Sequence, residues 1–189
     1  LRMQPHIENM NIDLDLIAPY SVASVAPWAL PVPNVLLNLS TYKKSDTEPL
    51  IYKAALDEIV LTYYTHIPIF TDGSKVDDKV AASAVVEGFE FMCRISDKSS
   101  IYSAELQALR MALIYIKRSS DLNFIILSDS LSSLMALKHL RLDHPILWKL
   151  FELLHGFREE GKSLLCFVGY QVTLVSVEMS RLIGLQKQL

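Results

Sequence analysis

Asp72 of this 189-residue chain lies at the end of an apolar run, where a carboxylate can bind a metal ion or take part in catalysis. It follows the apolar run from Ile67 to Phe70, and Gly73 comes directly after it. Such a pattern predicts a buried strand that carries a carboxylate to its end and then turns sharply away. Asp72 is therefore a candidate functional carboxylate at the edge of a sheet.

Two further acids stand in comparable settings. Glu105 lies at the start of a strong helical pattern, and Asp129 directly follows residues 125–128, a run typical of a second buried strand. Hard divalent cations prefer carboxylate oxygens, and two Mg²⁺ ions ~3.5–4 Å apart can drive the hydrolysis of a phosphodiester. The three acids together therefore indicate a site for divalent metal ions.

Each acid also has a plainer interpretation when it is taken alone. Asp72 suits a turn at a strand end, and Glu105 suits the first turn of a helix, where the helix dipole favours acids. Asp129, which precedes Ser130, suits the N-cap of a helix. The occurrence of all three in this order, on a strand–helix–strand pattern, favours a shared site.

The elements that would position these acids follow from the spacing of apolar residues. The predicted order is helix, strand, hairpin, helix, strand, two helices and a last strand, which is typical of an α/β fold with a mixed sheet between helices. The predicted strands span 66–72, 80–86, 89–95, 123–128 and 164–168, with a charged turn over 75–79. The predicted helices span 46–63, 103–118, 130–140 and 145–160.

The motifs Thr-Asp-Gly-Ser, Ser-Ala-Glu-Leu and Ser-Asp-Ser around the three acids resemble those of a known family. Over residues 64–168 the chain resembles the type 1 ribonuclease H domain of a non-LTR (LINE-like) retrotransposon polyprotein. The resemblance implies a ribonuclease H-like mixed sheet and endonucleolytic cleavage of the RNA strand of RNA–DNA hybrids. It also implies Asp72, Glu105 and Asp129 as catalytic residues that hold Mg²⁺ or Mn²⁺, with Asp72 bridging the metals.

The resemblance further implies how a nucleic acid would be held. Gly73 and Ser74 would let the backbone approach a nucleotide, and the hydroxyls of Ser103 and Ser130 are candidate contacts, since hybrid recognition uses the RNA 2′-hydroxyl. The expected partners are an RNA–DNA hybrid or another nucleic acid, and the reverse transcriptase region of the same polyprotein. No membrane partner is expected.

The resemblance breaks after Phe167. The family carries a histidine-containing loop and a fourth acid on a last helix, whereas this chain continues VGYQVTLVSVEMSRLIGLQKQL, with no Asp after Asp143. Codons permitted for residues 168–189, read two positions on, can spell WVPSHVGISGNEQADRAAKAA, which resembles the family's ending. We therefore hypothesise a frame shift near codons 160–168; genomic codons that do not yield this ending would contradict it.

Loss of the fourth acid is expected to impair cleavage. Two alternatives follow from the same observation. The chain is then either a catalytically dead nucleic-acid-binding module or a retroelement fragment without function.

The chain divides into four expected parts. Residues 1–45 are expected to be a linker or arm from a preceding polyprotein region, 46–63 a connecting helix, 64–168 the ribonuclease H-like domain and 169–189 an aberrant tail. The arm is apolar enough to need a surface, either on a preceding domain or on part of this one. It is interrupted by prolines that exclude a continuous helix, namely Pro19, Pro27, Pro31 and Pro33.

Bulk properties limit the class of protein. The formal net charge of −3 is unlike the basic balance of a strong nucleic-acid binder, although a few local Lys and Arg residues can supply phosphate contacts. No run reaches the ~18 apolar residues of a membrane span, and the N-terminus does not resemble a signal peptide. Cys93 and Cys166 are expected to be buried free thiols in a reducing compartment, which suits an intracellular site in cytoplasm or nucleus. The start at Leu1 suggests a piece of a longer reading frame.

Overall fold

The computed structural model describes residues 25–42, 47–86, 88–162 and 164–169. Within them the chain forms one six-stranded mixed sheet in the order β1-β6-β5-β2-β3-β4. The four strands from β1 to β2 in this order run parallel, and β3 and β4 are antiparallel to their neighbours. The strands are β1 (Asn34–Leu36), β2 (Ile67–Val76), β3 (Lys79–Val86), β4 (Phe89–Ile95), β5 (Asn123–Ser128) and β6 (Leu164–Gly169).

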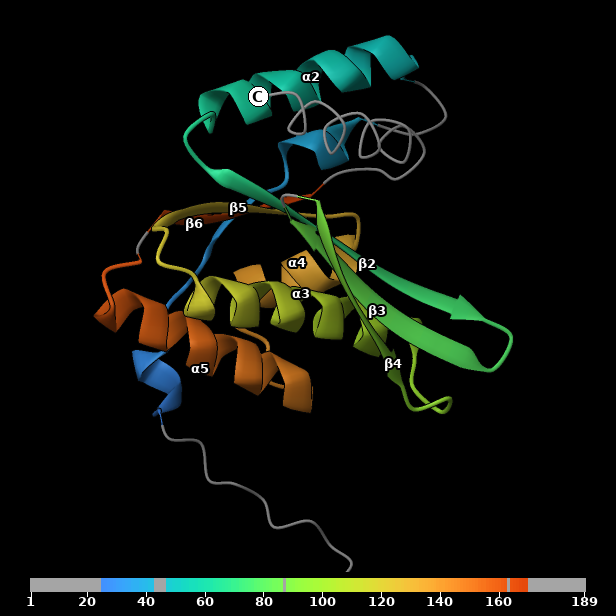
Figure 1. The fold of residues 1–189 in the computed structure, drawn as a ribbon, viewed down its shortest axis with the longest axis vertical. Helices are drawn as coiled ribbons and strands as arrows, with labels where there is room; N and C mark the ends of the chain where they lie inside the picture. Colours follow the sequence, from blue (N-terminus) through green and yellow to red (C-terminus); the bar gives the residue numbers. More distant parts are fainter. Residues whose placement is uncertain (1–24, 43–46, 87, 163, 170–189) are drawn as a thin grey trace, which may run out of the picture.

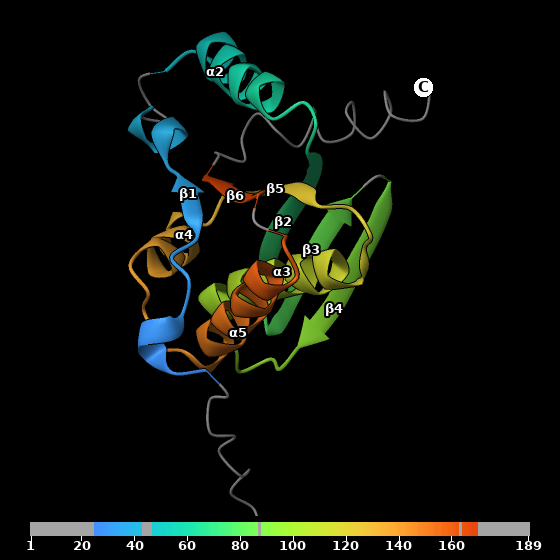
Figure 2. The same ribbon diagram turned by 90° about the vertical axis from the view of Figure 1, so that its left-hand side faces the viewer.

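Helices cover both faces of this sheet. Figures 1 and 2 show α3, α4 and α5 on one face and α2 on the other. Among the described residues, no helix has both the length and the apolar character needed to cross a membrane. The helices are α2 (Pro49–Thr62), α3 (Ile101–Arg118), α4 (Leu131–Lys138), α5 (Pro145–Glu159) and the short 3-10 helices η2 (Pro27–Ala29) and η3 (Asn38–Thr41).

The expected fold class, an α/β fold with a mixed sheet flanked by helices, is confirmed by this element order and by the strand directions. Most element bounds lie within two or three residues of the expected ones. The thiols of Cys93 and Cys166 are free. Cys166 is buried as expected, but Cys93 is only half-buried, because it lies on the edge strand β4.

The face covered by α3 and α5 holds the larger core. The apolar positions of α3 recur at helical spacing and are fully buried, as Leu106, Leu109 and Leu113 illustrate. They pack against sheet residues such as Ile69 and Ile126. The hydroxyl of Ser100 begins the helix by accepting a hydrogen bond from the backbone N–H of Ser103. This face therefore fixes α3 against β2.

The opposite face holds a smaller core. Tyr52 and Leu56 of α2 pack with Leu39 of η3 against sheet residues that include Phe70 and Leu127. A cavity of about 500 Å³ lies between α2 and η3 and is partly polar, with Glu58 among its lining residues. The connecting helix is thus attached to the sheet over a limited surface.

The arm contributes to this domain. Residues 34–36 of β1 pair in parallel with residues 166–168 of β6. Leu30 and Val35 are buried in the larger core. Of the two surfaces considered for the arm, its described part, residues 25–42, therefore covers part of this domain. Pairing with a strand so distant in the sequence leaves no local signal, and the prolines around β1 obscure it further.

The strand that carries Asp72 is longer than expected. The sequence pattern predicts that β2 ends at Asp72 and that a turn covers residues 75–79, but β2 continues to Val76 and turns at Asp77 and Asp78. The reason is that antiparallel pairing with β3 persists to Val76 and Lys79 after the parallel pairing with β5 has stopped. The expected end of β2 at Asp72 and the expected turn over residues 75–79 are therefore wrong. Gly73 lies inside the strand and not in a turn.

Candidate metal centre

Asp72 and Asp129 lie where two neighbouring parallel strands part. The last paired residues of β2 and β5 are Thr71 and Ser128, and each acid is the residue that follows. The hydroxyl of Thr71 donates a hydrogen bond of 3.2 Å to the carbonyl of Leu127, which ties the two strands together just before they separate. The register of the sheet therefore brings these two carboxylates side by side.

Glu105 reaches the same place from α3. The helix begins at Ile101, so Glu105 lies beyond the first turn, and the interpretation of Glu105 as a first-turn acid is wrong. Its side chain is only 8% exposed. A glutamate at this depth is not explained by a favourable helix dipole, whose effect is strongest at the exposed first turn.

Gly73 is the residue that allows this approach. A Cβ atom at Gly73 would lie 2.6 Å from the backbone nitrogen of Glu105 and 2.9 Å from its carboxyl carbon. Real Cβ atoms essentially never come so close to backbone, so any larger residue would push α3 away from β2. The glycine after Asp72 is thus not the turn signal that the sequence pattern suggests, because it marks close packing of helix on strand.

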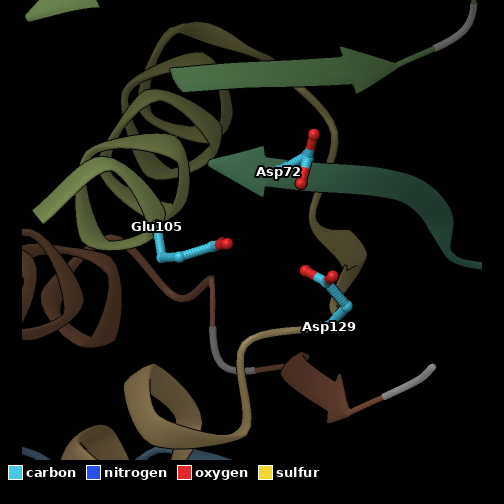
Figure 3. A group of neighbouring side chains, drawn as sticks. All are labelled: Asp72, Glu105 and Asp129. Atoms are coloured by element: carbon cyan, nitrogen blue, oxygen red, sulfur yellow. The ribbon is translucent and has the colours of Figure 1, made fainter. Parts of the chain in front are cut away.

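The three carboxylates converge on one point. Single oxygens of Asp72, Glu105 and Asp129 all lie within 4.8 Å of one another. Figure 3 shows the three side chains directed toward a shared space between β2, α3 and the end of β5. Asp72 is exposed, Asp129 is half-buried and Glu105 is buried, so the cluster opens to solvent on one side. The structure therefore brings together the three acids that the sequence singled out.

Burial and the neighbouring charges act on the pKa of Glu105. The pKa of its carboxyl is raised from 4.5 to about 8, chiefly by burial and then by the negative charges of Asp129 and Asp72, against a backbone hydrogen bond from Gly73 that lowers it. Oε2 of Glu105 is buried without a hydrogen-bond partner among the described residues. Buried carboxylate oxygens normally have partners, so this atom needs an explanation.

A bound divalent cation would supply that explanation. Three carboxylates of like charge within 4.8 Å repel one another, and hard oxygen donors in this number suit Mg²⁺, Mn²⁺ or Ca²⁺. A cation among Asp72, Glu105 and Asp129 would offset the repulsion and satisfy the orphan oxygen of Glu105. The residues present are therefore compatible with a divalent metal ion.

The four candidate substrate-binding residues lie in different surroundings. Gly73 is buried against α3, whereas Ser74 is exposed one position further along β2. The hydroxyl of Ser103 lies 3.1 Å from Nε2 of His144. The hydroxyl of Ser130 lies 2.8 Å from that of Ser133. Ser130, not Asp129, is the N-cap residue of α4, and its side chain makes no capping hydrogen bond.

His144 links two helices, a role that follows from its contacts and not from its place in the sequence. Its Nδ1 accepts a hydrogen bond of 3.2 Å from the backbone N–H of Ile146 and so caps α5. With Nδ1 an acceptor, the neutral ring carries its proton on Nε2 and donates to the hydroxyl of Ser103. The ring also meets Tyr102 edge-on, at 5.6 Å between centroids. The start of α5 is thereby joined to the first turn of α3.

The fold and the cluster together define a mixed α/β domain that presents three convergent carboxylates at the point where two parallel strands part. No family model matches the chain, and no curated protein matches it. Among solved structures it is similar to LC11-RNase H1, whose crystal structure is in complex with an RNA/DNA hybrid. The identity is 20%, the match covers 56% of this chain and 86% of the other, and the TM-score is 0.46.

Proposed function

We propose that this chain is a divalent-metal-dependent ribonuclease H domain of a retroelement polyprotein, which cleaves the RNA strand of RNA–DNA hybrids with impaired efficiency. The observation that carries the proposal is the convergence of Asp72, Glu105 and Asp129 within 4.8 Å at one edge of the sheet. The motif order around these acids, which resembles the family, supports the choice of substrate.

In this proposal Asp72, Glu105 and Asp129 hold Mg²⁺ or Mn²⁺, which when bound supplies an activated water and neutralises charge on the scissile phosphate. The chain's own contribution is to hold the three acids in a fixed arrangement. The pairing of Thr71 with Ser128 positions two of them, and the close contact of Gly73 with α3 positions the third. No side chain has to reorganise for the acids to converge.

The protonation of Glu105 sets a further condition. Because the pKa of its carboxyl is about 8 without metal, Glu105 carries a proton at neutral pH. It must lose that proton to act as a ligand, so metal affinity is expected to rise with pH up to about 8. A proton release on metal binding near pH 7 would accord with this assignment.

The substrate contacts proposed from the resemblance are the backbone at Gly73 and the hydroxyls of Ser74, Ser103 and Ser130. Ser74 is the most accessible of these, because it is exposed two residues beyond Asp72. The proposed partners are an RNA–DNA hybrid or other nucleic acid and the reverse transcriptase region of the same polyprotein.

A second function, hybrid binding without cleavage, is favoured by one observation. The chain has no Asp after Asp143, so the fourth acid of the family is missing from its expected place. Three carboxylates can still attract a metal ion and the phosphates that it contacts, while the chemistry is lost. Both functions predict binding of metal ion and hybrid, but only the nuclease yields cleaved RNA.

The test is the cleavage of a labelled RNA–DNA hybrid by the full chain with Mg²⁺ or Mn²⁺, beside calorimetry of Mn²⁺ alone. Asp72→Asn should abolish both signals, whereas Asp57→Asn, an exposed site on α2, should leave both unchanged. Mn²⁺ binding without cleavage would favour the binding module. Absence of Mn²⁺ binding by the unaltered chain would overturn the proposed site.

A repaired chain tests the impairment. Replacing residues 168–189 by the ending hypothesised from the shifted reading frame restores the family's fourth acid. Cleavage is expected to rise by about tenfold or more, since a lost metal ligand or outer-shell partner typically costs roughly 10- to 100-fold. Equal cleavage by the two chains would show that three acids suffice.

A further inference from the structure

β4 forms one outer edge of the sheet. Within the described parts of the chain it pairs with β3 alone, and Figure 2 shows it at the opposite edge from β1. Its sequence from Phe89 to Ile95 lacks the Pro and Lys residues that commonly protect such edges. Met92 is 72% exposed and Phe89 is 64% exposed. The strand is therefore open to pairing with a further strand.

The hairpin geometry decides which residues of β4 present their backbone groups to that open edge. The two-residue connection to β3 closes on Val86 and Phe89 as partners. Hydrogen-bonded pairs alternate along an antiparallel ladder, so Phe89, Phe91 and every second residue bond to β3. The N–H and C=O groups of the residues between them point away from the sheet. These residues are Glu90, Met92 and Arg94.

These three residues form a self-complementary pattern. Glu90 and Arg94 lie two positions on either side of Met92 and carry opposite charges. We propose that β4 pairs antiparallel with β4 of a second copy of this chain, with the dyad at Met92. Glu90 then faces Arg94 of the second copy, and Arg94 faces Glu90, so both ends of the pairing join opposite charges.

The register follows from the same pattern. Centring the dyad on Glu90 or on Arg94 would place two like charges directly opposite each other, which destabilises a sheet. Centring it on Met92 also gives the longest overlap of the strand, with all seven residues from Phe89 to Ile95 paired. Exposed apolar area on Met92 is covered by the same residue of the second copy.

Arg94 already contacts an acid within its own chain. Its guanidinium lies 2.9 Å from Oδ1 of Asp97, and both side chains are about half exposed. An exposed pair of this kind contributes little to stability, and a guanidinium has five donors. Arg94 can therefore contact Glu90 of the second copy while it keeps Asp97.

The proposed dyad at Met92 lies in the same row of the sheet as Asp72 of the carboxylate cluster. Asp72 pairs with Ser83, and Ser83 pairs with Met92, so the three lie in one row across the sheet and point to the same face. Pairing about Met92 continues this row into the second copy. Two strand spacings of ~4.8 Å separate Asp72 from Met92 at the dyad.

The experiment is sedimentation equilibrium of the full chain over a wide concentration range, without metal or nucleic acid, so that its outcome is independent of the proposed nuclease. The unaltered chain should dimerise. Glu90→Arg or Arg94→Glu alone should raise the dissociation constant about tenfold or more, because two attractive contacts become repulsive. Asp57→Arg, with the same charge change as Glu90→Arg at an exposed site of α2, should leave the constant unchanged.

Mixing the two single variants provides the decisive comparison. Chains with Glu90→Arg present two positive residues, and chains with Arg94→Glu present two negative ones, so a mixture should form heterodimers. Circular dichroism of each variant checks that it is folded. A chain that stays monomeric at all concentrations would overturn the proposal. A dimer insensitive to both substitutions would do the same, since it would use another surface.

Discussion

The two faces of the sheet differ in how closely one of their helices approaches a strand. On the α3 face, helix and strand approach so closely that a single Cβ atom at Gly73 would collide with backbone. On the α2 face, a cavity of about 500 Å³ remains between α2 and η3. Close packing leaves little freedom to the residues it holds, whereas a cavity lets them shift. The close contact at Gly73 thus lies directly beside two of the three carboxylates, Asp72 and Glu105.

The carboxylate cluster is assembled from α3 and from two strands of the sheet. Glu105 is contributed by α3, Asp72 by β2, and Asp129 by the position that directly follows β5. Convergence of the acids therefore depends on the α3 face. The following substitutions test this difference, from the largest expected effect to the smallest.

Leu113→Ala on α3 should lower the free energy of unfolding by about 3–5 kcal/mol, because this side chain is fully buried in the larger core. Leu56→Ala on α2 should cost less, about 2 kcal/mol, since it belongs to the smaller core beside the cavity. Urea denaturation of both variants measures the difference. Equal losses would show that the two faces are packed alike.

Gly73→Ala should lower the free energy of unfolding by about 1–3 kcal/mol, because α3 must move away from β2 to accept the added Cβ. The same displacement should reduce Mn²⁺ affinity measured by calorimetry. Gly156→Ala is the matched control, since a Cβ at this helical position meets nothing within 4 Å. The Gly156→Ala substitution should raise the free energy of unfolding by up to about 1 kcal/mol, because Ala favours a helix more than Gly does. A Gly73→Ala chain as stable as the unaltered one would show that the contact is not tight.

Glu105→Gln should stabilise the metal-free chain by about 1–2 kcal/mol at pH 8 and above, because a buried carboxylate beside two like charges is replaced by a neutral group. It should also abolish the stabilisation that Mg²⁺ gives to the unaltered chain. Thermal unfolding with and without Mg²⁺ measures both effects. Loss of stability in the metal-free variant would contradict the unfavourable burial and charge repulsion assigned to the Glu105 carboxylate.

The pH dependence of stability follows from the same group. The pKa of Glu105 is about 8 in the folded chain and 4.5 in the unfolded one, so between these values the folded state binds the additional proton. Stability of the metal-free chain should therefore fall as pH rises from 4.5 to 8. The Glu105→Gln variant should lack this slope. A slope retained in the variant would assign it to other groups.

Ser100→Ala should cost about 1 kcal/mol, the usual value of an N-cap hydrogen bond, here the one from the N–H of Ser103 at the start of α3. Ser120→Ala, at an exposed position after the same helix, should change stability by less than about 0.5 kcal/mol. Denaturation midpoints of the two variants make the comparison. An effect at Ser100 no larger than at Ser120 would rule out the cap as a stabiliser of α3.

Local patterns are sufficient to predict most elements and the three acids. Apolar spacing identifies α3 and β5, and the residues around Asp72, Glu105 and Asp129 mark these acids as candidates from the sequence alone. The elements are confirmed because each depends on residues within one short stretch, and the structure brings the three acids together. The periods of helix and strand, and the acid at the end of an apolar run, are visible in short stretches of sequence.

Tertiary structure decided the rest. The extension of β2 past Asp72 depends on its pairing with β3, and the pairing of β1 with β6 joins segments far apart in the chain. The close approach of Gly73 to α3, and with it the burial and raised pKa of Glu105, arises only when helix and strand are packed together. The sequence alone determined which groups the chain carries, and packing determined their distances and protonation, because both depend on neighbours that the sequence does not place side by side.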